Sequence, residues 1–168
     1  ERRIAARTIL WAAGVAASPL GKQLVGDSGG AELDRAGRVR VADDLSLPKL
    51  PEVFVAGDLA SLQQDGKQVP GVAPAAKQMG QHVALSIKAA LAGRTAPLFR
   101  YRNYGNLATI GRGSAVADFG RIRLTGSLAW ALWGVVHLGF LIGFRNRLTV
   151  LLDWAWSYFF FARGARLI

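Results

Sequence analysis

The chain has 168 residues, of which 51% are hydrophobic and 19% charged, so it can bury a core and still expose apolar surface. It contains no cysteine, which excludes disulfides, thiolate metal sites and a redox-active dithiol. Its two histidines, His82 and His137, are too far apart in the sequence to suggest zinc, so we expect no metal.

The net charge of +10 is concentrated in the C-terminal part of the chain. Residues 94–168 hold ten arginines, no lysine and two acidic residues, Asp118 and Asp153. An excess of basic residues is typical of proteins that bind nucleic acid. Here the arginines flank long apolar runs, which favours an anionic membrane surface and not nucleic acid.

The first predicted element is a short strand over Thr8–Trp11. The residues that follow it, Ala12, Ala13 and Gly14, are small and allow a ligand or a neighbouring strand to approach the backbone. A buried strand followed by a glycine turn explains the same pattern without a ligand.

Short elements are predicted between residues 18 and 50. A Ser-Pro pair predicts a helix over Leu20–Leu24, and Gly26–Gly30 is predicted to be a loop. Alternating apolar and polar residues predict a hairpin-like piece over Glu32–Val41. Leu45–Leu50 is predicted to be an extended connector, preceded by a solvent-facing acidic pair, Asp43-Asp44.

The stretch from residue 53 to residue 80 has the layout of a cofactor-binding edge. Val53–Ala56 predicts a fully buried strand that ends at Gly57-Asp58, and a helix follows with Pro74 in its first turn. Glycine allows a ligand close to the backbone, the carboxylate accepts hydrogen bonds from sugar-type hydroxyls, and the helix N-terminus offers N–H groups. An ordinary exit from a strand into a turn has the same pattern.

The helix is predicted to run from Ala73 or Ala75 to about Ala92, with Gly93 as its C-terminal cap. Spacings of three and four residues predict that one apolar stripe faces the core. We expect His82 to be a partly exposed helix residue without a catalytic role. The predicted stripe consists of Ala76, Met79, Val83, Ile87 and Ala90.

Short strands separated by glycines are predicted after Pro97. Phe99–Arg102 reads as a half-exposed strand. Three more candidates, at Leu107–Ile110, Ala115–Ala117 and Ile122–Leu124, predict a small antiparallel sheet. The Gly-Arg-Gly sequence at 111–113 is not a dinucleotide loop, because it lacks the third glycine and a following helix.

The C-terminal region contains two apolar segments. Ser127–Phe144 has no charged residue, Arg145-Asn146-Arg147 is predicted to end this helix, and Leu148–Ala162 forms the second segment. Eighteen apolar residues are at the lower limit for a membrane-spanning helix. The residues leave three architectures open: a transmembrane hairpin, helices lying in the membrane plane, and an ordinary buried helix pair.

Four motifs together resemble the C-terminal portion of type II NADH dehydrogenases, the single-subunit, non-proton-pumping NADH:quinone oxidoreductases. They are VFVAGD at 53–58, VAPAAKQ at 72–78, NLATIGRGSAVADFG at 106–120 and GFRNR at 143–147. The resemblance implies an α/β fold, part of a two-dinucleotide-domain (Rossmann-like) flavoprotein. Its expected parts are the second half of an FAD-binding domain at 1–97, a small antiparallel β region at 98–126 and C-terminal membrane-anchoring helices at 127–168.

The resemblance also implies FAD as cofactor, NADH as substrate and a membrane quinone as acceptor. Lys77 and Gln78 are the implied catalytic residues, and Pro74 and Gln78 the implied quinone contacts. The family's usual glutamine is replaced here by Pro74, which has no side-chain amide. The implied cofactor-binding residues are Gly57, Asp58, Ala73, Pro74, Ala76, Lys77, Ala13 and Gly14.

In the resembled family the C-terminal helices attach the enzyme to one membrane face without crossing it. The resemblance therefore implies a peripheral, monotopic protein on the cytoplasmic face of the cell inner membrane, with a homodimer as a possible assembly. We expect His137 to turn toward protein or toward a quinone tunnel. The implied membrane residues are Trp130, Trp133, Arg145, Arg147, Trp154, Trp156 and Arg163.

No G-x-G-x-x-G motif occurs in these residues, whereas the family has two such loops, one for FAD and one for NADH. We therefore expect the chain to be the C-terminal part of a longer protein and to be inactive alone. Two alternatives stay open: a flavoprotein similar to sulfide:quinone oxidoreductases, and a non-catalytic, basic, membrane-associated binding module.

Overall fold

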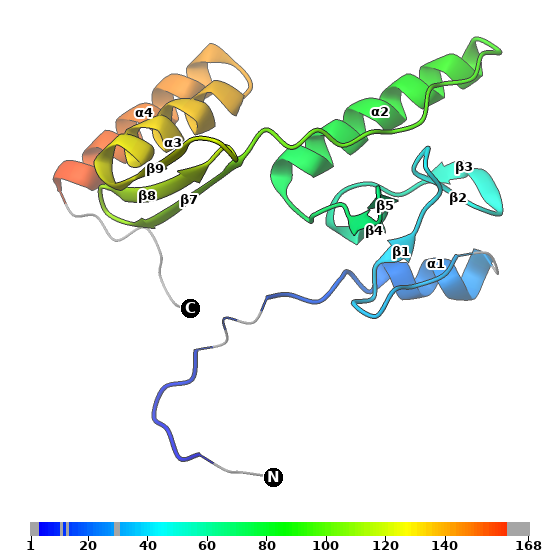
Figure 1. The fold of residues 1–168 in the computed structure, drawn as a ribbon, viewed down its shortest axis with the longest axis horizontal. Helices are drawn as coiled ribbons and strands as arrows, with labels where there is room; N and C mark the ends of the chain where they lie inside the picture. The colour runs from blue at the N-terminus through cyan, green and yellow to red at the C-terminus, as the bar shows by residue number, and fades with distance from the viewer. Residues whose placement is uncertain (1–3, 11, 13, 29–30, 161–168) are drawn as a thin grey trace. The chain divides into compact units, whose positions relative to one another are not determined.

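The computed structural model describes residues 4–10, 12, 14–28 and 31–160 (Figure 1). The chain divides into two compact units, Glu1–Asn103 and Tyr104–Ile168. The fold is mixed α/β, and each unit has its own hydrophobic cluster. The small antiparallel sheet and the helices that follow it belong to the same unit.

The core of the first unit is built around Val39, Leu45 and Leu47, which have no exposed side-chain surface. Burying side chains of this size stabilises the fold by roughly 1.5–3 kcal/mol each. Strand β1 (Val39–Arg40) pairs in parallel with β4 (Ala60–Ser61), with Val39 opposite Ala60. Parallel pairing of strands buried in a mixed α/β layer is typical of Rossmann-like domains.

The hairpin-like piece predicted before β1 is confirmed. Leu33 and Val39 form an antiparallel bridge, and Gly37 turns the chain with a φ of +81°. The Asp34 carboxylate accepts the Arg38 Nε–H at 2.7 Å and the Ala36 and Arg38 backbone N–H groups at 2.9 Å. Burial alone would raise the pKa of Asp34, but these hydrogen bonds hold it below its ordinary value.

Two predictions near the N-terminus are wrong. Residues 8–10 form no strand, and Ile9 and Leu10 are 85% and 88% exposed, while Trp11 lies outside the described residues. No strand among the described residues pairs with this segment, so its backbone groups lack the partners that a strand requires. Helix α1 (Leu20–Ser28) begins as predicted but continues through Gly26, which was expected to lie in a loop.

The segment around Leu45 is a hairpin and not an extended connector. Strand β2 (Ser46–Leu47) pairs antiparallel with β3 (Leu50–Phe54). The fully buried strand predicted at Val53–Ala56 is also wrong, because β3 ends at Phe54 and only Val55 of the four residues is buried. In the described part of the chain β3 pairs with β2 alone.

Asp44 does not face solvent as predicted. It is half-buried, and its carboxylate accepts the Ser46 hydroxyl at 2.6 Å and the Ser46 N–H at 3.0 Å. Burial acts to raise the pKa of Asp44, but these donors and the nearby His82 hold it below its ordinary value. The carboxylate therefore stabilises the turn that leads into β2.

The chain then passes through a 3₁₀ helix, η1 (Gly57–Leu59), and a two-residue hairpin. This hairpin joins β5 (Gln63–Gln64) to β6 (Lys67–Gln68), and φ is positive at both Asp65 and Gly66. Positive φ at both central residues is the turn that matches the twist of adjoining strands, and Asp-Gly is a preferred sequence for it.

The predicted long helix is confirmed as α2 (Ala73–Leu91), with Pro74 in its first turn. Gly93 caps its C-terminal end with a φ of +65°, and its N–H donates to Ala90 O. The predicted stripe is confirmed at Met79, which is buried, and at Val83, which is half-buried and packs on the core, but Ile87 and Ala90 are exposed. The buried residues of α2 are Ala75, Met79, His82 and Ser86. Both the predicted stripe and the observed buried face have spacings of three and four residues, so spacing does not distinguish them. Hydrophobicity favours the predicted stripe, because the observed face contains a histidine and a serine.

His82 is 8% exposed, so its predicted partial exposure is also wrong. Its ring packs edge-on against Phe99 with the centroids 5.4 Å apart. Among the described residues, no hydrogen-bond partner reaches His82 Nε2 or Ser86 Oγ. Burial lowers the pKa of His82 below its ordinary value of 6.5, and the Asp44 carboxylate partly opposes this shift.

The predicted antiparallel sheet is confirmed in the second unit, in the order β7 (Asn106–Gly111), β8 (Ser114–Asp118) and β9 (Arg123–Thr125). Helix α3 (Gly126–Phe140) packs on this sheet. Ala115, Ala117 and Ala129 form the buried contact. These small side chains allow the helix to approach the sheet closely.

The two apolar helices do not meet where the sequence predicted. Helix α3 ends at Phe140, and α4 (Phe144–Phe159) begins before the arginines that were expected to end the first helix. Arg147 Nε donates to Leu141 O at 2.9 Å, and a terminal guanidinium N–H of Arg147 donates to Gly139 O at 3.0 Å. Arg147, although it belongs to α4, thus caps the C-terminal end of α3. The sequence around Arg147 does not predict this interaction.

Within the described residues, no helix is long and apolar enough to cross a membrane. In the same residues, α4 has no buried position. The choice among the three predicted architectures stays a prediction.

We predict that His82→Phe reduces the acid sensitivity of the full-length protein. The folded state lowers the pKa of His82, so its neutral ring contributes stability above about pH 6.5, which is lost as the pH falls through the lower folded pKa. The melting temperature should therefore fall less between about pH 7.5 and about pH 5.5 in this variant than in the parent. His137→Phe is the control, and equal pH dependence in His82→Phe and the parent would contradict the prediction.

We predict that Gly105→Ala destabilises the second unit by roughly 2 kcal/mol. Gly105 has a φ of +104°, and an added Cβ would lie 2.7 Å from Asp118 O and 2.5 Å from Phe119 Cδ1. The matched control is Gly111→Ala, because nothing lies within 4 Å of the Cβ position there. Urea unfolding of the full-length variants measures the difference, and equal stability of the two variants would show the prediction to be wrong.

Candidate cofactor edge and apolar groove

The structure brings Gly57 next to the first turns of α2. Gly57 has a φ of +77°, its N–H donates to Met79 Sδ at 3.3 Å, and an added Cβ would lie 3.5 Å from Ala76 Cβ. The positive φ is the conformation in which glycine is favoured over residues with a side chain. The 3₁₀ helix η1, which follows β3, therefore lies against the first turns of α2.

Asp58 lies at the entrance to α2. Its side chain is exposed, and its Oδ1 is 3.5 Å from the position of a Cβ added to Gly71. The carboxylate is thus close to the loop that enters the helix, and the glycine leaves room beside it. An exposed carboxylate that carries no ion pair among the described residues can accept hydrogen bonds from hydroxyl groups.

The N-terminus of α2 has fewer available N–H groups than the sequence predicted. Pro74 has no N–H, and Ala75 and Ala76 both donate to Val72 O, at 2.9 and 3.1 Å. Val72, the N-cap residue, makes no side-chain cap. The start of the helix still carries the positive partial charge of the helix dipole.

The remaining predicted residues of this edge are placed as follows. Lys77 is exposed on the first turns of α2, and Pro74 and Ala76 are half-buried. Gln78 accepts the Arg102 N–H with its Oε1 and donates its Nε2 to Arg102 O, both at 2.9 Å. The roles assigned to these four residues, and to Ala73 at the helix start, stay predictions.

The N-terminal pair of predicted cofactor residues is only partly described. Gly14 has a φ of +88° and lies in a segment without helix or strand. Ala13 lies outside the described residues. Their role at a cofactor also stays a prediction. In the described part of the chain, no group of three or more metal-ligating side chains is present.

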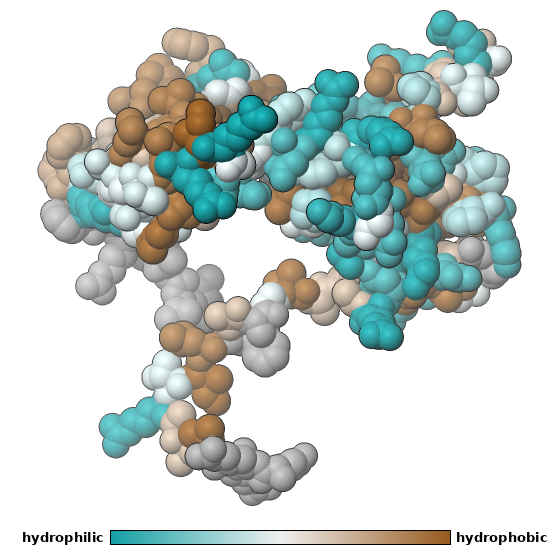
Figure 2. Space-filling model, viewed as in Figure 1, coloured by the Kyte–Doolittle hydropathy of each residue, from teal (hydrophilic) through white to brown (hydrophobic). Residues whose placement is uncertain are grey.

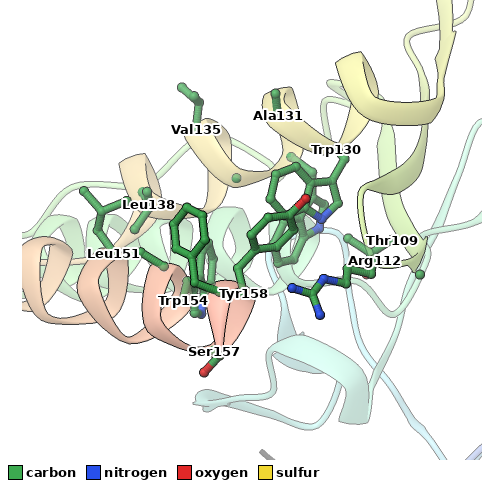
Figure 3. A pocket seen from close by; sticks show the side chains of 15 residues that line it. Thr109, Arg112, Trp130, Ala131, Val135, Leu138, Leu151, Trp154, Ser157 and Tyr158 are labelled. Carbon is green, nitrogen blue, oxygen red and sulfur yellow. The ribbon is translucent and has the colours of Figure 1, made fainter. Parts of the chain in front are cut away.

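A second feature, which sequence reasoning missed, is an apolar groove of about 1110 Å³ in the second unit (Figure 3). Trp133 of α3 stacks on Trp154 of α4 with ring centroids 5.2 Å apart, and Trp130 lies 5.4 Å from Tyr158. The Arg112 guanidinium, from the turn between β7 and β8, is 4.4 Å above the Tyr158 ring. Trp130 and Trp133 are three residues apart in α3, and Trp154 and Tyr158 are four apart in α4, so each pair lies on one face of its helix. This spacing is the sequence pattern that could have predicted the groove.

The surface around this groove is apolar, and Figure 2 shows hydrophobic residues gathered over α3 and α4. Val135, Leu152 and Trp156 are 60–70% exposed. His137 lies along its own helix: its Nδ1 is 2.8 Å from Trp133 O, and its ring stacks on Trp133 with centroids 4.1 Å apart. Its predicted orientation, toward protein or toward a quinone tunnel, stays a prediction.

The predicted membrane residues differ in their surroundings. Arg145 is exposed near the start of α4, whereas Arg147 is engaged with the carbonyls of α3. Trp156 packs against Phe160 in a tilted arrangement with the ring centroids 3.9 Å apart. Arg163 lies outside the described residues. Membrane contact by any of these side chains stays a prediction.

The first unit has a Rossmann-like fold, with a glycine–carboxylate edge beside the start of a helix. Residues 1–80 match the pyridine nucleotide-disulphide oxidoreductase family. Residues 104–163 match the NDH2 C-terminal domain family. The two matches follow one another along the chain, and the boundary between the two structural units lies between them.

The chain is similar to two proteins of Mycobacterium tuberculosis. It is 46% identical over 166 residues to type II NADH:quinone oxidoreductase Ndh, covering 97% of this chain and 35% of that protein. It is 45% identical over 172 residues to type II NADH:quinone oxidoreductase NdhA, covering 100% of this chain and 36% of that protein. The chain thus spans about a third of the length of these curated relatives.

A solved structure, NDH2 from Plasmodium falciparum in complex with NADH, has the same fold. It aligns with a TM-score of 0.72 at 15% identity, covering 93% of this chain and 46% of that chain. Together these matches show that the chain belongs to the type II NADH dehydrogenase family and corresponds to its C-terminal portion.

Proposed function

We propose that this chain is part of an FAD-dependent enzyme that transfers electrons from NADH to a membrane quinone without pumping protons. The observation that carries the proposal is the edge at which Gly57 and Asp58 meet the start of α2. Bound FAD would supply the redox chemistry, accepting a hydride from NADH and donating two electrons to the quinone. The protein's own residues bind, orient and tune the cofactor.

The edge fits the ribityl and pyrophosphate part of FAD. The absence of a side chain at Gly57 lets a ligand approach the backbone, and the exposed carboxylate of Asp58 can accept hydrogen bonds from ribityl hydroxyls. The start of α2 carries a positive partial charge from the helix dipole, and Lys77 adds a full charge. Positive charge here favours negative charge on a reduced flavin ring lying along Ala73, Pro74 and Ala76.

We further propose that the second unit attaches the enzyme to the cytoplasmic face of the inner membrane as a monotopic protein, with homodimerisation as an additional possibility. The support is the exposed apolar surface of α3 and α4 together with the arginine excess of this unit. Aromatic residues favour the membrane interface, and arginines bind lipid phosphates. A quinone would then reach the enzyme from the lipid phase.

We predict that the full-length protein has a flavin absorbance spectrum and oxidises NADH when a short-chain quinone is added. Asp58→Ala should lower the flavin bound per protein severalfold, because the carboxylate that accepts the ribityl hydroxyls is lost. Asp43→Ala, at another exposed carboxylate, is the matched control and should retain flavin. A colourless parent protein would overturn the enzyme proposal and favour a non-catalytic membrane module.

We predict that Trp156→Ser weakens binding of the full-length protein to vesicles, because a 61% exposed indole is lost from the apolar surface. Arg145→Ser should weaken binding to vesicles containing anionic lipid more than binding to neutral vesicles, and added salt should reduce that difference. Co-sedimentation measures both effects. Leu85→Ser, at a 59% exposed apolar residue of the first unit, is the control, and equal loss in this variant would contradict the assignment.

A further inference from the structure

The segment Phe99–Arg102 is held in an unusual way just before the second unit begins at Tyr104. It was predicted to be a strand, but no strand of the described chain pairs with it, so that prediction is wrong. The segment nevertheless has the alternation of a strand, with Phe99 and Tyr101 packed on the core and Arg100 and Arg102 exposed. Its backbone groups must therefore find partners other than a neighbouring strand.

Two glutamine side chains supply these partners. Tyr101 N–H donates to Gln64 Oε1 at 2.7 Å, and Gln64 Nε2 donates back to Tyr101 O at 3.2 Å. Arg102 N–H donates to Gln78 Oε1 at 2.9 Å, and Gln78 Nε2 donates back to Arg102 O at 2.9 Å. Each carboxamide thus reproduces the two-bond exchange of a hydrogen-bonded antiparallel residue pair.

The two glutamines act on opposite edges of the segment. In an extended chain the N–H and C=O of one residue point to one side, and those of the next residue point to the other. Gln64 therefore lies on one side and Gln78 on the other. Only one amide orientation at each glutamine satisfies both bonds, because the flipped orientation would set N–H against N–H and oxygen against oxygen.

Other contacts of the segment are weaker or less specific. Phe99 N–H donates to Asp43 O at 2.8 Å, which anchors the start of the segment to the turn before β2. Arg100 and Asp65 form an ion pair of 3.4 Å, but both side chains are more than 70% exposed, so the pair contributes little. The two glutamines are therefore the specific attachment at the C-terminal end of the segment.

We infer that Gln64 and Gln78 are a pair of positioning residues for the chain that enters the membrane-facing unit: Gln64 fixes it to the β5–β6 hairpin, and Gln78 fixes it to the helix of the cofactor edge. Gln78 is one helical turn from Pro74, and its two bonds to Arg102 tie α2 to the last residues before the second unit. Through these bonds it would contribute to quinone reduction by holding this connection. This part of the inference rests on the proposed function. The four hydrogen bonds that Gln64 and Gln78 make to Tyr101 and Arg102, called the clamp below, do not depend on it.

The test separates a clamp from a ligand contact by comparing Gln64→Ala with Gln78→Ala in the full-length flavoenzyme. Gln64 is on the β5–β6 hairpin and outside every residue predicted to meet flavin or quinone. Gln63→Ala and Gln81→Ala are the matched controls, since both are exposed neighbours of the clamp residues in the same elements. If Gln64→Ala or Gln78→Ala does not fold, Gln→Met at the same position preserves side-chain length and removes both hydrogen bonds.

Hydrogen exchange of the peptide containing Tyr101 and Arg102 is the first readout. Each clamp variant should exchange about tenfold faster there, the equivalent of one net hydrogen bond, while the controls stay at the parent rate. The second readout is the KM for a short-chain quinone, which should rise in both clamp variants. In Gln64→Ala the rate of flavin reduction by NADH should stay unchanged. Unchanged exchange in both clamp variants would overturn the clamp.

A rise in quinone KM in Gln78→Ala but not in Gln64→Ala, with faster exchange in both, would overturn the positioning role and assign Gln78 to the quinone itself. A parent enzyme without quinone reductase activity would overturn the proposed function, and the exchange measurement would still decide whether the clamp exists.

Discussion

The contact between η1 and the first turns of α2 is the constraint on which the candidate site depends. Gly57 can adopt its positive φ without a side-chain penalty, and its N–H bonds to Met79 because the helix lies against it. Met79 is 2% exposed, so this contact is anchored in the same core as Val39, Leu45 and Leu47. Loss of that core would separate Asp58 from the helix start, since no ion pair or disulfide among the described residues links the two.

Sequence reasoning identified the features that local chemistry determines. Pro74 near the start of α2 and Gly93 after its end bracket the helix correctly, because each residue restricts the backbone at its own position. The sheet of the second unit was predicted for the same reason, since glycines separate its alternating strands. The Gly57-Asp58 pair of the site was also visible as a motif, but the sequence did not predict that Asp58 lies beside Gly71.

The features that were missed depend on residues far apart in the chain. The buried face of α2 includes His82 and Ser86, because Phe99 and the segment near Asp44 cover it, and hydrophobicity alone favoured another stripe. Arg147 was taken as a helix end, but it caps carbonyls six and eight residues before it. Thr8–Leu10 has strand propensity and no partner strand in the described chain, and propensity alone does not form a strand.

The two units differ in the side chains that stabilise them: polar side chains bond the backbone in the first unit, and aromatic side chains pack together in the second. This difference bears on function. In the first unit, polar side chains complete the backbone: Asp34 and Asp44 close turns, and Gln64 and Gln78 replace a missing strand. In the second unit the aromatic residues around the groove pair with one another and leave their outer faces exposed. A surface of this kind is unfavourable in water and favourable at a lipid boundary. At Tyr101 and Arg102, the segment that joins the two environments is held by hydrogen bonds to Gln64 and Gln78, in addition to the packing of Tyr101 on the core. Such bonds fix direction more strictly than apolar contacts do, because they require specific distances and angles.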